Sequence, residues 1–336
     1  MKLVTGGSGV IGRELVQKIL KKGENVRVYD LAPPPIKNPN IEFLRGDIKD
    51  PEKVMEACKG VDTVFHLAGK MPQARLDEKG FWEINVGGSL NIAKASVKNN
   101  VRRILFASTI EVYGPQKIRK PLKEDDKKVY TGHYSRNKME CEKLFLKYQK
   151  KFGLEVSFLR IPMVLGPGFY HEKSTLGIFL LIRYGMPIPV PFADIPLCYV
   201  ASSDLADAFL LAEKSPNAVG EAFNIAAPDY PRAKPFFKSL VKSVNSRSRV
   251  IVPPRGFVES ALRLFKRVSS MMYKSITPSE LMDFVLYGGA YSIEKAKKLL
   301  GYSPKKTVLQ AWRECYLWFF SQDFNTQMDT LLRQRV

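Results

Sequence analysis

The chain has 336 residues, 45% of them hydrophobic, which is enough for one large α/β domain or for one and a half smaller ones. Its formal net charge of +20 favours anionic partners, but the lysines are scattered in pairs without interleaved aromatic residues, so we expect no nucleic-acid partner. No run of 18 apolar residues occurs and the sequence enters a predicted strand at once, so we expect neither a membrane-spanning helix nor a signal peptide.

The first predicted elements are a short buried strand over 2–5 and a helix over 13–22, with a glycine-rich turn between them. Gly6, Gly9 and Gly12 have the spacing G-x-x-G-x-x-G. The first glycine allows a tight turn, the second lets the backbone approach a pyrophosphate, and the third lets the helix pack close to the strand. Because the helix N-terminus also presents N–H groups, the turn predicts a dinucleotide-phosphate site.

A second strand is predicted over 25–30, and it ends in Asp30, 18 residues after Gly12. A carboxylate at this place accepts hydrogen bonds from the adenosine ribose hydroxyls and repels the 2′-phosphate of NADP. Asp30 therefore predicts NAD as the cofactor.

Strands and helices continue to alternate up to residue 160. Further strands are predicted over 41–45, 63–67, 103–108 and 155–160. Helices are predicted between them over 51–58, 80–99 and 134–152. This alternation predicts a parallel, doubly wound Rossmann sheet.

After residue 160 the pattern is broken by six prolines, at 162, 167, 187, 189, 191 and 196. Strands are predicted over 222–225 and within 249–254, and helices over 204–214, 279–285, 292–300 and 307–321. We expect a NAD-binding Rossmann domain over 1–165, to which 200–226 return. A smaller, discontinuous substrate lobe is expected over 166–199 and 227–336.

The chemistry is predicted from two places in the first half. Tyr134 and Lys138 lie four residues apart, so a helix would place both on one face, where a lysine ammonium lowers the pKa of a phenol. Such a tyrosine can act as the acid/base of a hydroxyl–carbonyl interconversion. Ser108 and Thr109 end a buried strand, where a hydroxyl would point into the ligand crevice of the sheet.

These motifs resemble the extended short-chain dehydrogenase/reductases, also called the NAD-dependent epimerase/dehydratase family, and the resemblance extends over nearly the whole chain. The matching segments are TGGSGVIG at 5–12, GDI at 46–48, HLAG at 66–69, NVGGSLN at 85–91, STIEVYG at 108–114, RIPMVLGPG at 160–168 and YSIEKAKKLLGYSP at 291–304. Gly69 stands where the family motif has an alanine.

The resemblance implies that Tyr134 is the acid/base, that Lys138 binds the nicotinamide ribose, and that Thr109, with Ser108 beside it, positions the substrate oxygen. Glu111 could be a second acid/base. The residues implied in NAD binding are Gly6, Gly9, Val10, Ile11, Gly12, Asp30, Asp47, Ile48, Leu67, Ala68, Gly69, Asn85, Ser108, Tyr134, Lys138, Ile161, Pro162 and Val164.

The family contains two classes of enzyme between which the sequence has to choose. One class oxidises or reduces hydroxyls on apolar substrates, as 3β-hydroxysteroid dehydrogenases do. We favour this class because the predicted lobe is apolar and the segment 195–204 offers no arginine for a diphosphate. The apolar pocket residues expected there are Phe179, Leu180, Leu181, Met186, Phe192 and Leu197.

Two alternatives stay open. The segment STIEVYG also resembles nucleotide-sugar epimerases, dehydratases and decarboxylases that recycle a bound NAD, and Arg183 could supply the missing cation. However, Ile110 stands where the dehydratases carry an aspartate. A non-catalytic NAD-binding protein is the third possibility, although such proteins commonly lose the tyrosine or the lysine.

The remaining expectations concern partners and compartment. Cys58, Cys141, Cys198 and Cys315 have no metal or disulfide spacing, so we expect free thiols, no metal site and a cytoplasmic protein. The amphipathic segment 255–274 could lie on an acidic membrane surface, but we favour a lid or packing helix of the substrate lobe. The resemblance implies a homodimer.

Overall fold

The fold is that of a computed structural model of the chain. The structure describes residues 1–71, 74, 76–114, 120–129, 132–168, 173–191, 193–254, 256–258, 260 and 289–323.

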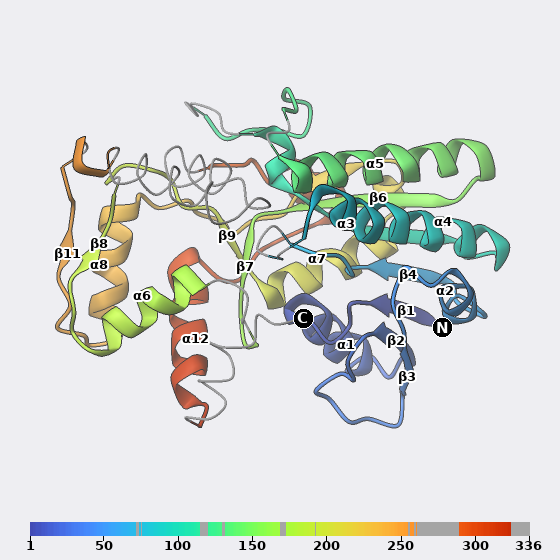
Figure 1. The fold of residues 1–336 in the computed structure, drawn as a ribbon, viewed down its shortest axis with the longest axis horizontal. Helices are drawn as coiled ribbons and strands as arrows, with labels where there is room; N and C mark the ends of the chain where they lie inside the picture. Colours follow the sequence, from blue (N-terminus) through green and yellow to red (C-terminus); the bar gives the residue numbers. More distant parts are fainter. Residues whose placement is uncertain are drawn as a thin grey trace.

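A seven-stranded parallel sheet forms the centre of the larger part of the molecule (Figure 1). The strand order is β10-β6-β5-β4-β1-β2-β3, and every neighbouring pair is parallel. The strands are β1 (Lys2–Thr5), β2 (Val26–Asp30), β3 (Ile41–Arg45), β4 (Thr63–His66), β5 (Arg103–Thr109), β6 (Glu155–Ile161) and β10 (Ala222–Asn224). The order reverses between β1 and β4, which confirms the predicted doubly wound sheet.

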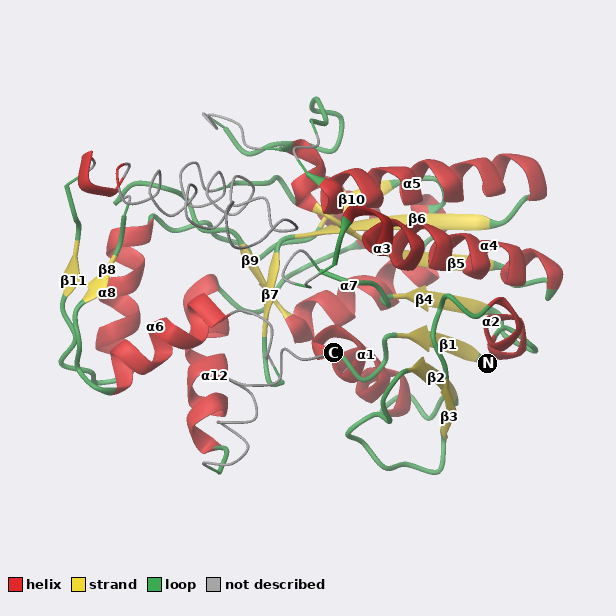
Figure 2. Cartoon of the chain, in the orientation of Figure 1, coloured by secondary structure: helices red, strands yellow, loops and turns green. Residues whose placement is uncertain are grey.

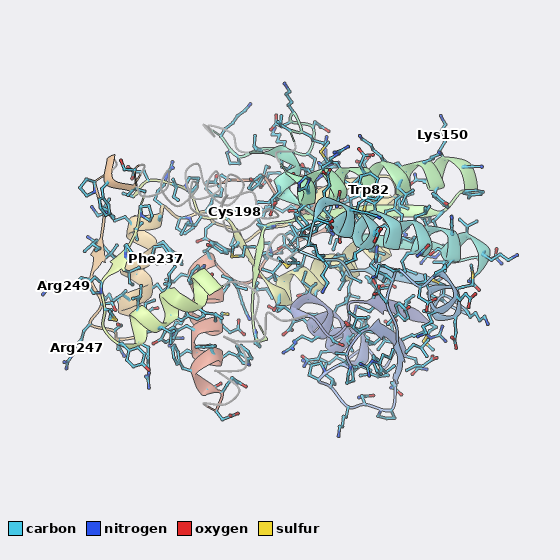
Figure 3. All side chains as sticks on the ribbon, viewed as in Figure 1. Trp82, Lys150, Cys198, Phe237, Arg247 and Arg249 are labelled. Atoms are coloured by element: carbon cyan, nitrogen blue, oxygen red, sulfur yellow. The ribbon has the colours of Figure 1, made fainter. Side chains whose placement is uncertain are left out.

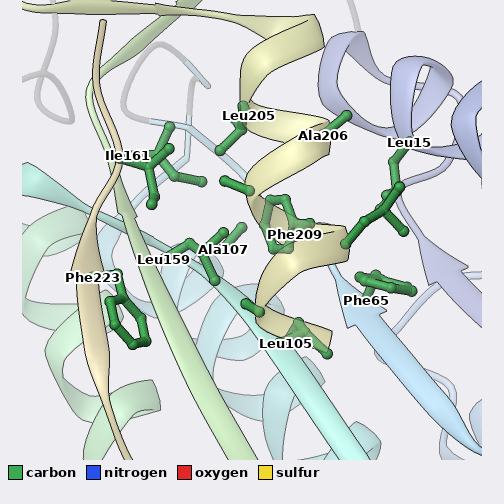
Figure 4. Packing of buried hydrophobic residues seen from close by; sticks show 14 of the residues in the cluster. Leu15, Phe65, Leu105, Ala107, Leu159, Ile161, Leu205, Ala206, Phe209 and Phe223 are labelled. Atoms are coloured by element: carbon green, nitrogen blue, oxygen red, sulfur yellow. The ribbon is translucent and has the colours of Figure 1, made fainter. Parts of the chain in front are cut away.

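Helices cover both faces of the sheet. One face carries α1 (Val10–Leu20), α7 (Ser202–Lys214) and α11 (Glu294–Leu300), and the other carries α2 (Pro51–Ala57), α4 (Gly88–Lys98) and α5 (His133–Phe152). On the first face, Phe209 of α7 lies among Leu15, Phe65 and Leu105, so that helix and strands share one core (Figure 4). Burial of these apolar side chains from water stabilises the three-layer arrangement.

Between β4 and β5 the chain forms one helical run with a wider turn in its middle. The run consists of α3 (Glu78–Trp82), the π-helical turn η1 (Glu83–Gly87) and α4. The sequence predicts a single helix over 80–99, and this prediction does not include the π turn. Such turns occur mostly as single insertions, often at functional sites, and η1 contains Asn85.

A smaller lobe lies beside the sheet (Figure 2). It packs around an aromatic core. It contains α6 (Lys173–Arg183), α8 (Ala233–Ser243), α12 (Val308–Ser321) and the two-stranded pair β8 (Ile188–Pro189) with β11 (Val250–Ile251). A second pair, β7 (Met163–Leu165) with β9 (Tyr199–Ala201), joins the lobe to the sheet. The 3₁₀ turns η2 (Ile110–Tyr113) and η3 (Pro216–Ala218) complete the described elements.

Several elements differ from the prediction. Helix α1 begins at Val10, earlier than the predicted 13, so Gly12 lies inside its first turn. Helices α6 and α8 are not predicted, although Pro235 is in the first turn of α8, where a missing N–H costs no intrahelical bond. The domain boundaries stay a prediction.

Two predicted segments fall mainly outside the described residues: the helix over 279–285 entirely, and the amphipathic segment 255–274 except for residues 256–258 and 260. Among the helices that the structure describes, none is both long and apolar enough to cross a membrane.

Candidate active site at the carboxyl edge of the sheet

The predicted site residues come from segments that follow the carboxyl ends of β1 to β6, and from η1 and α5. Parallel strands place all these ends at one edge of the sheet, and ligands of doubly wound sheets bind outside that edge. The fold therefore brings together segments that lie far apart in the sequence.

The glycine-rich turn leaves room that a larger residue would fill. Gly6 has φ +72°, and a Cβ there would lie 2.8 Å from the backbone nitrogen of Ala68. A Cβ on Gly12 would lie 2.2 Å from the carbonyl oxygen of Gly6. Gly9 is exposed, and a Cβ on it would meet only the Gly6 carbonyl oxygen, at 3.4 Å. It precedes α1 as the N-cap residue and makes no side-chain cap. An open surface beside uncapped helix N–H groups fits a diphosphate.

Asp30 fixes this turn at the end of β2. One carboxylate oxygen accepts from the backbone N–H of Ser8 at 2.9 Å and the other from that of Leu31 at 2.7 Å. The second oxygen also accepts from the Ala32 N–H at 3.4 Å, but the oxygen bonded to Ser8 has a further lone pair, so the carboxylate can still accept from a ribose hydroxyl. The acidic group and the glycine turn thus fit the adenosine half of NAD.

Asp47 and Ile48 follow β3. The Tyr29 hydroxyl donates to the Asp47 carbonyl oxygen at 2.8 Å, and the Asn91 amide donates to that of Ile48 at 3.0 Å. The Ile48 side chain is 6% exposed, so it is mainly a core residue, whereas Asp47 is half-buried. Ile161 and Pro162, at the end of β6, are also buried, and Val164 is half-buried.

A chain of hydrogen bonds runs from β1 to the π turn through His66. Ser89 donates to the carbonyl oxygen of Asn85 at 2.6 Å, so its oxygen has to accept from His66 Nε2 at 3.1 Å. His66 Nδ1 is then the acceptor for the Thr5 hydroxyl at 2.8 Å, which itself accepts from Ala68 N–H at 3.2 Å. The chain therefore requires neutral His66 with its hydrogen on Nε2.

We expect His66 to make stability depend on pH below 6.5. Burial lowers the pKa of His66 from 6.5 to about 3, with a smaller contribution from the Lys138 charge. Between these values the unfolded chain binds a proton that the folded chain does not, so the free energy of unfolding falls as the pH falls. At pH 4.5 the loss is about 3 kcal/mol.

NMR titration of the histidine rings measures this directly, with urea unfolding at pH 7 and 4.5 beside it. The variant His133→Gln, which removes a half-exposed ring, is expected to keep the pH dependence, whereas His66→Asn is expected to flatten it. A His66 ring that titrates near pH 6.5 in the folded protein would contradict the assignment.

Asn85 explains why residue 69 is a glycine. The Asn85 side chain accepts from the backbone N–H of Lys70 at 2.8 Å and donates to the Lys70 carbonyl oxygen at 3.1 Å. A Cβ on Gly69 would lie 2.9 Å from Asn85 Oδ1 and 3.8 Å from Lys138 Nζ. Glycine therefore lets the amide and the lysine approach the turn after β4.

Lys138 and Tyr134 lie together on α5, as predicted from their spacing. Lys138 is 6% exposed, donates to the Ala107 carbonyl oxygen at 2.8 Å, and lies 4.7 Å from the centre of the Phe106 ring and 5.7 Å from that of Tyr134. Within the described part of the chain, the Tyr134 hydroxyl has no hydrogen-bond partner, so it can meet a ligand.

The expected lowering of the Tyr134 pKa is wrong for this arrangement. Burial raises the pKa of Tyr134, and the charges of Glu111 and Cys141 raise it further. Burial also lowers the pKa of Lys138. The pair is dry enough that desolvation outweighs the attraction between ammonium and phenolate, and Tyr134 is held in its protonated form.

The two predicted hydroxyls have different environments. Ser108 donates to Glu142 at 2.6 Å and faces α5 from inside the sheet. Thr109 accepts from the backbone N–H of Glu111 at 3.2 Å, and no described residue takes its hydroxyl hydrogen. Thr109 can therefore donate to a ligand, whereas the hydrogen of Ser108 is already used.

Glu142 is part of a buried network that the sequence did not predict. Arg160 donates to both of its carboxylate oxygens, at 3.1 and 2.8 Å. The same guanidinium donates to the Tyr113 hydroxyl at 3.0 Å, which donates to Asn224 Oδ1 at 2.8 Å. Position 142 follows Lys138 by four residues on α5, which is the one sequence signal that could have revealed it.

The network ties together β5, β6, β10 and α5 beneath the predicted site. A further carboxylate, Glu124, accepts from the backbone N–H of Asn224 at 2.8 Å. These partners fix the end of β5, and with it the position of Thr109, relative to Tyr134 on α5.

The expected apolar pocket is partly wrong. Phe179 is fully buried in the lobe's own core, with its ring centre 5.7 Å from that of Trp312 and 5.5 Å from that of Tyr316. Leu181 and Leu197 pack against the same core, and Met186 is 51% exposed. Leu180 is half-buried, and Phe192 lies outside the described residues. Aromatic side chains of this lobe hold it together, because their large apolar area is removed from water.

Comparison with known proteins identifies the family. The model of the "NAD dependent epimerase/dehydratase family" matches residues 2–226. This chain belongs to that family. It is an extended short-chain dehydrogenase/reductase, an enzyme family with NAD-dependent oxidoreductase and epimerase activities.

Relatives of this extended short-chain dehydrogenase/reductase fall on both sides of the predicted division. The "Uncharacterized protein y4nG" of Sinorhizobium fredii is 32% identical over 94% of this chain and 78% of its own length. A 3-beta-hydroxysteroid dehydrogenase of Mycolicibacterium neoaurum is 26% identical, covering 97% of this chain and 93% of its own.

Among solved structures, a UDP-glucose 4-epimerase of Thermotoga maritima with UDP-glucose matches with a TM-score of 0.75 and 23% identity, over 95% of this chain and 98% of its own. At that identity the likeness establishes the fold.

Proposed function

We propose that this chain interconverts a secondary hydroxyl and a ketone on an apolar, sterol-like or long-chain substrate, with NAD as its cofactor. The observation that carries the proposal is the half-buried Tyr134 next to the buried Lys138, together with a Thr109 hydroxyl at the end of β5 whose hydrogen no described residue accepts. These three groups supply what a hydroxyl–carbonyl interconversion needs: a proton donor or acceptor, a cation beside it, and a donor that holds the substrate oxygen.

In this proposal each residue acts on one atom. The Tyr134 hydroxyl gives its proton to the carbonyl oxygen during reduction and takes it back during oxidation. Thr109 donates a hydrogen bond to the same oxygen, and the Lys138 ammonium favours the phenolate when the proton has left. The glycine turn and Asp30 hold NAD, which supplies or accepts the hydride when bound.

The apolar substrate class is supported by the segment 193–201, which carries no lysine or arginine. A nucleotide-sugar diphosphate needs a cation of suitable geometry. Arg183, which could replace the missing arginine of segment 195–204, ends α6, and its guanidinium carbon lies 5.5 Å from the centre of the Phe320 ring. The hydroxysteroid dehydrogenase relative supports the same class.

A second candidate is a nucleotide-sugar epimerase or decarboxylase that keeps and recycles its NAD. Its support is Glu111, whose charge acts on Tyr134 and which could serve as a second acid/base. A non-catalytic NAD-binding protein is the third candidate, and the presence of both Tyr134 and Lys138 speaks against it. The homodimer and the cytoplasmic location stay predictions.

The test is the nucleotide that the purified protein releases on denaturation. We expect an empty or exchangeable site, followed by NAD-dependent oxidation of a sterol or long-chain alcohol. Stoichiometric NAD that survives purification, together with turnover of a UDP-, GDP- or dTDP-sugar, would contradict the proposal and favour the recycling epimerase.

A further inference from the structure

The end of the smaller lobe that is farthest from the sheet exposes both apolar and basic side chains. This surface, here called the lobe tip, consists of Arg183, Tyr184, Met186, Arg247, Arg249, Ile251, Val252 and Phe257. Tyr184 is 74% exposed, Phe257 69% and Met186 51%. Figure 1 places β8 and β11 at this end, and Figure 3 shows Arg247 and Arg249 pointing outward from it.

The backbone under the lobe tip is fixed by hydrogen bonds. The backbone N–H groups of Ile188 and Val190 donate to the carbonyl oxygens of Arg249 and Ile251, at 2.8 and 2.9 Å. Beside this pair, Ser246 and Ser248 donate to the carbonyl oxygens of Ile182 and Leu181 in the last turn of α6, which also accept from backbone N–H groups of the following turn. The exposed side chains are therefore presented by an ordered frame.

The composition of the lobe tip is unusual for a surface in water. Residue 248 is buried and residue 251 exposed, so the outward positions of this strand carry Arg249 and Ile251. Neither 183–189 nor 246–258 contains an aspartate or a glutamate. The described part of the chain offers Arg247 and Arg249 no ion pair. Contiguous exposed apolar groups mark a binding surface, and this one is purely basic in charge.

We propose that the lobe tip docks on an anionic lipid bilayer. Tyr184, Met186, Ile251, Val252 and Phe257 enter the interface between headgroups and acyl chains, and Arg247 and Arg249 pair with lipid phosphates. The net charge of +20 adds a long-range attraction to such a surface.

A lipid surface suits the lobe tip better than a second copy of the chain. A two-fold interface would place the same patch on both sides and bring the arginines of both copies together, where no acidic residue of the patch could neutralise them. Aliphatic side chains such as Ile251 gain from an apolar phase but not from a nucleic-acid backbone. The proposal does not depend on the substrate of the enzyme.

The experiment is co-sedimentation of the full chain with vesicles of phosphatidylcholine alone or with 30% phosphatidylglycerol. We expect the chain to bind the anionic vesicles at least tenfold more tightly than the neutral ones, and we expect this binding to weaken with added salt. The double variants Arg247→Glu/Arg249→Glu and Tyr184→Ser/Phe257→Ser are each expected to lower the partition coefficient tenfold or more.

The matched control is Lys147→Glu/Lys150→Glu, which makes the same change in net charge at exposed positions of α5, at the other end of the molecule (Figure 3). We expect it to bind within about threefold of the unmodified chain, because headgroup contacts act at short range. Unfolding midpoints of all variants establish that they fold.

Four results of the binding assays would overturn the proposal. These are no binding to anionic vesicles, unchanged binding of both tip variants, an equal loss in the α5 control, or binding to single-stranded DNA that the tip variants abolish without vesicle binding. Sedimentation equilibrium is run in parallel. A dimer that the tip variants convert to monomer would assign the surface to a second copy instead.

Discussion

Replacing Tyr134 by phenylalanine is expected to lower kcat by about 10²–10⁴-fold and to leave NAD binding nearly unchanged. The hydroxyl that is lost belongs to a half-buried side chain beside Lys138 and has no hydrogen-bond partner among the described residues. Once a bound substrate excludes water from this position, nothing there replaces the lost acid. The ring itself stays, so the packing of α5 against η1 is kept.

The measurement is steady-state kinetics with an alcohol that the unmodified protein oxidises in the NAD-dependent assay proposed above, together with NAD titration by fluorescence. Tyr148→Phe makes the same chemical change on the same helix away from the site, and its kcat is expected to match that of the unmodified enzyme. The companion variant Thr109→Val should lose activity, whereas Ser108→Ala should act mainly on stability. Full activity of Tyr134→Phe would assign the proton transfer to another group.

The pH profile distinguishes a chemical role of Tyr134 from a structural one. Because burial raises the pKa of Tyr134, reduction, which needs the protonated phenol, is expected to persist at neutral and moderately alkaline pH. Oxidation needs the phenolate, so its kcat/KM should rise with pH in the same range. A profile that is flat in both directions would contradict proton transfer by this residue.

Arg160→Met is expected to destabilise the protein by about 3–5 kcal/mol. The side chains of Arg160 and Glu142 are 4% and 10% exposed, and the guanidinium makes two of the hydrogen bonds that Glu142 accepts. Removing it leaves a buried carboxylate with Ser108 as its remaining partner in the network. Urea unfolding at pH 7 measures the loss.

Two further variants separate the pair from its parts. Arg160→Met/Glu142→Leu removes both charges, and we expect it to recover most of the stability, because a buried pair often does little better than apolar side chains of similar size. Arg102→Met breaks surface ion pairs with Asp62 and Glu155, whose side chains are 55% and 33% exposed, so it should cost less than about 1 kcal/mol. An Arg160 variant no less stable than Arg102→Met would show that the network carries no net stability.

Local patterns in the sequence were enough for the first half of the fold. The strands at 2–5 and 41–45 agree with the prediction at both ends, because short apolar runs bounded by turns leave few other conformations. Beyond residue 160 the prediction missed α6 and α8, where apolar residues pack on all sides or a proline lies in the first turn. In such segments the structure depends on packing against other elements of the lobe, which the local sequence pattern does not reveal.

What the sequence determined by itself is the chemistry of local spacing: the glycine turn before α1, Asp30 at the end of β2, and Tyr134 four residues before Lys138. Each depends on backbone geometry within a few residues. Only the tertiary structure decided that Ser108 donates to Glu142 while Thr109 keeps its hydrogen, that His66 is neutral, and that burial raises the pKa of Tyr134. These properties depend on desolvation and on partners far away in the chain, and both arise only when the strands and helices pack together.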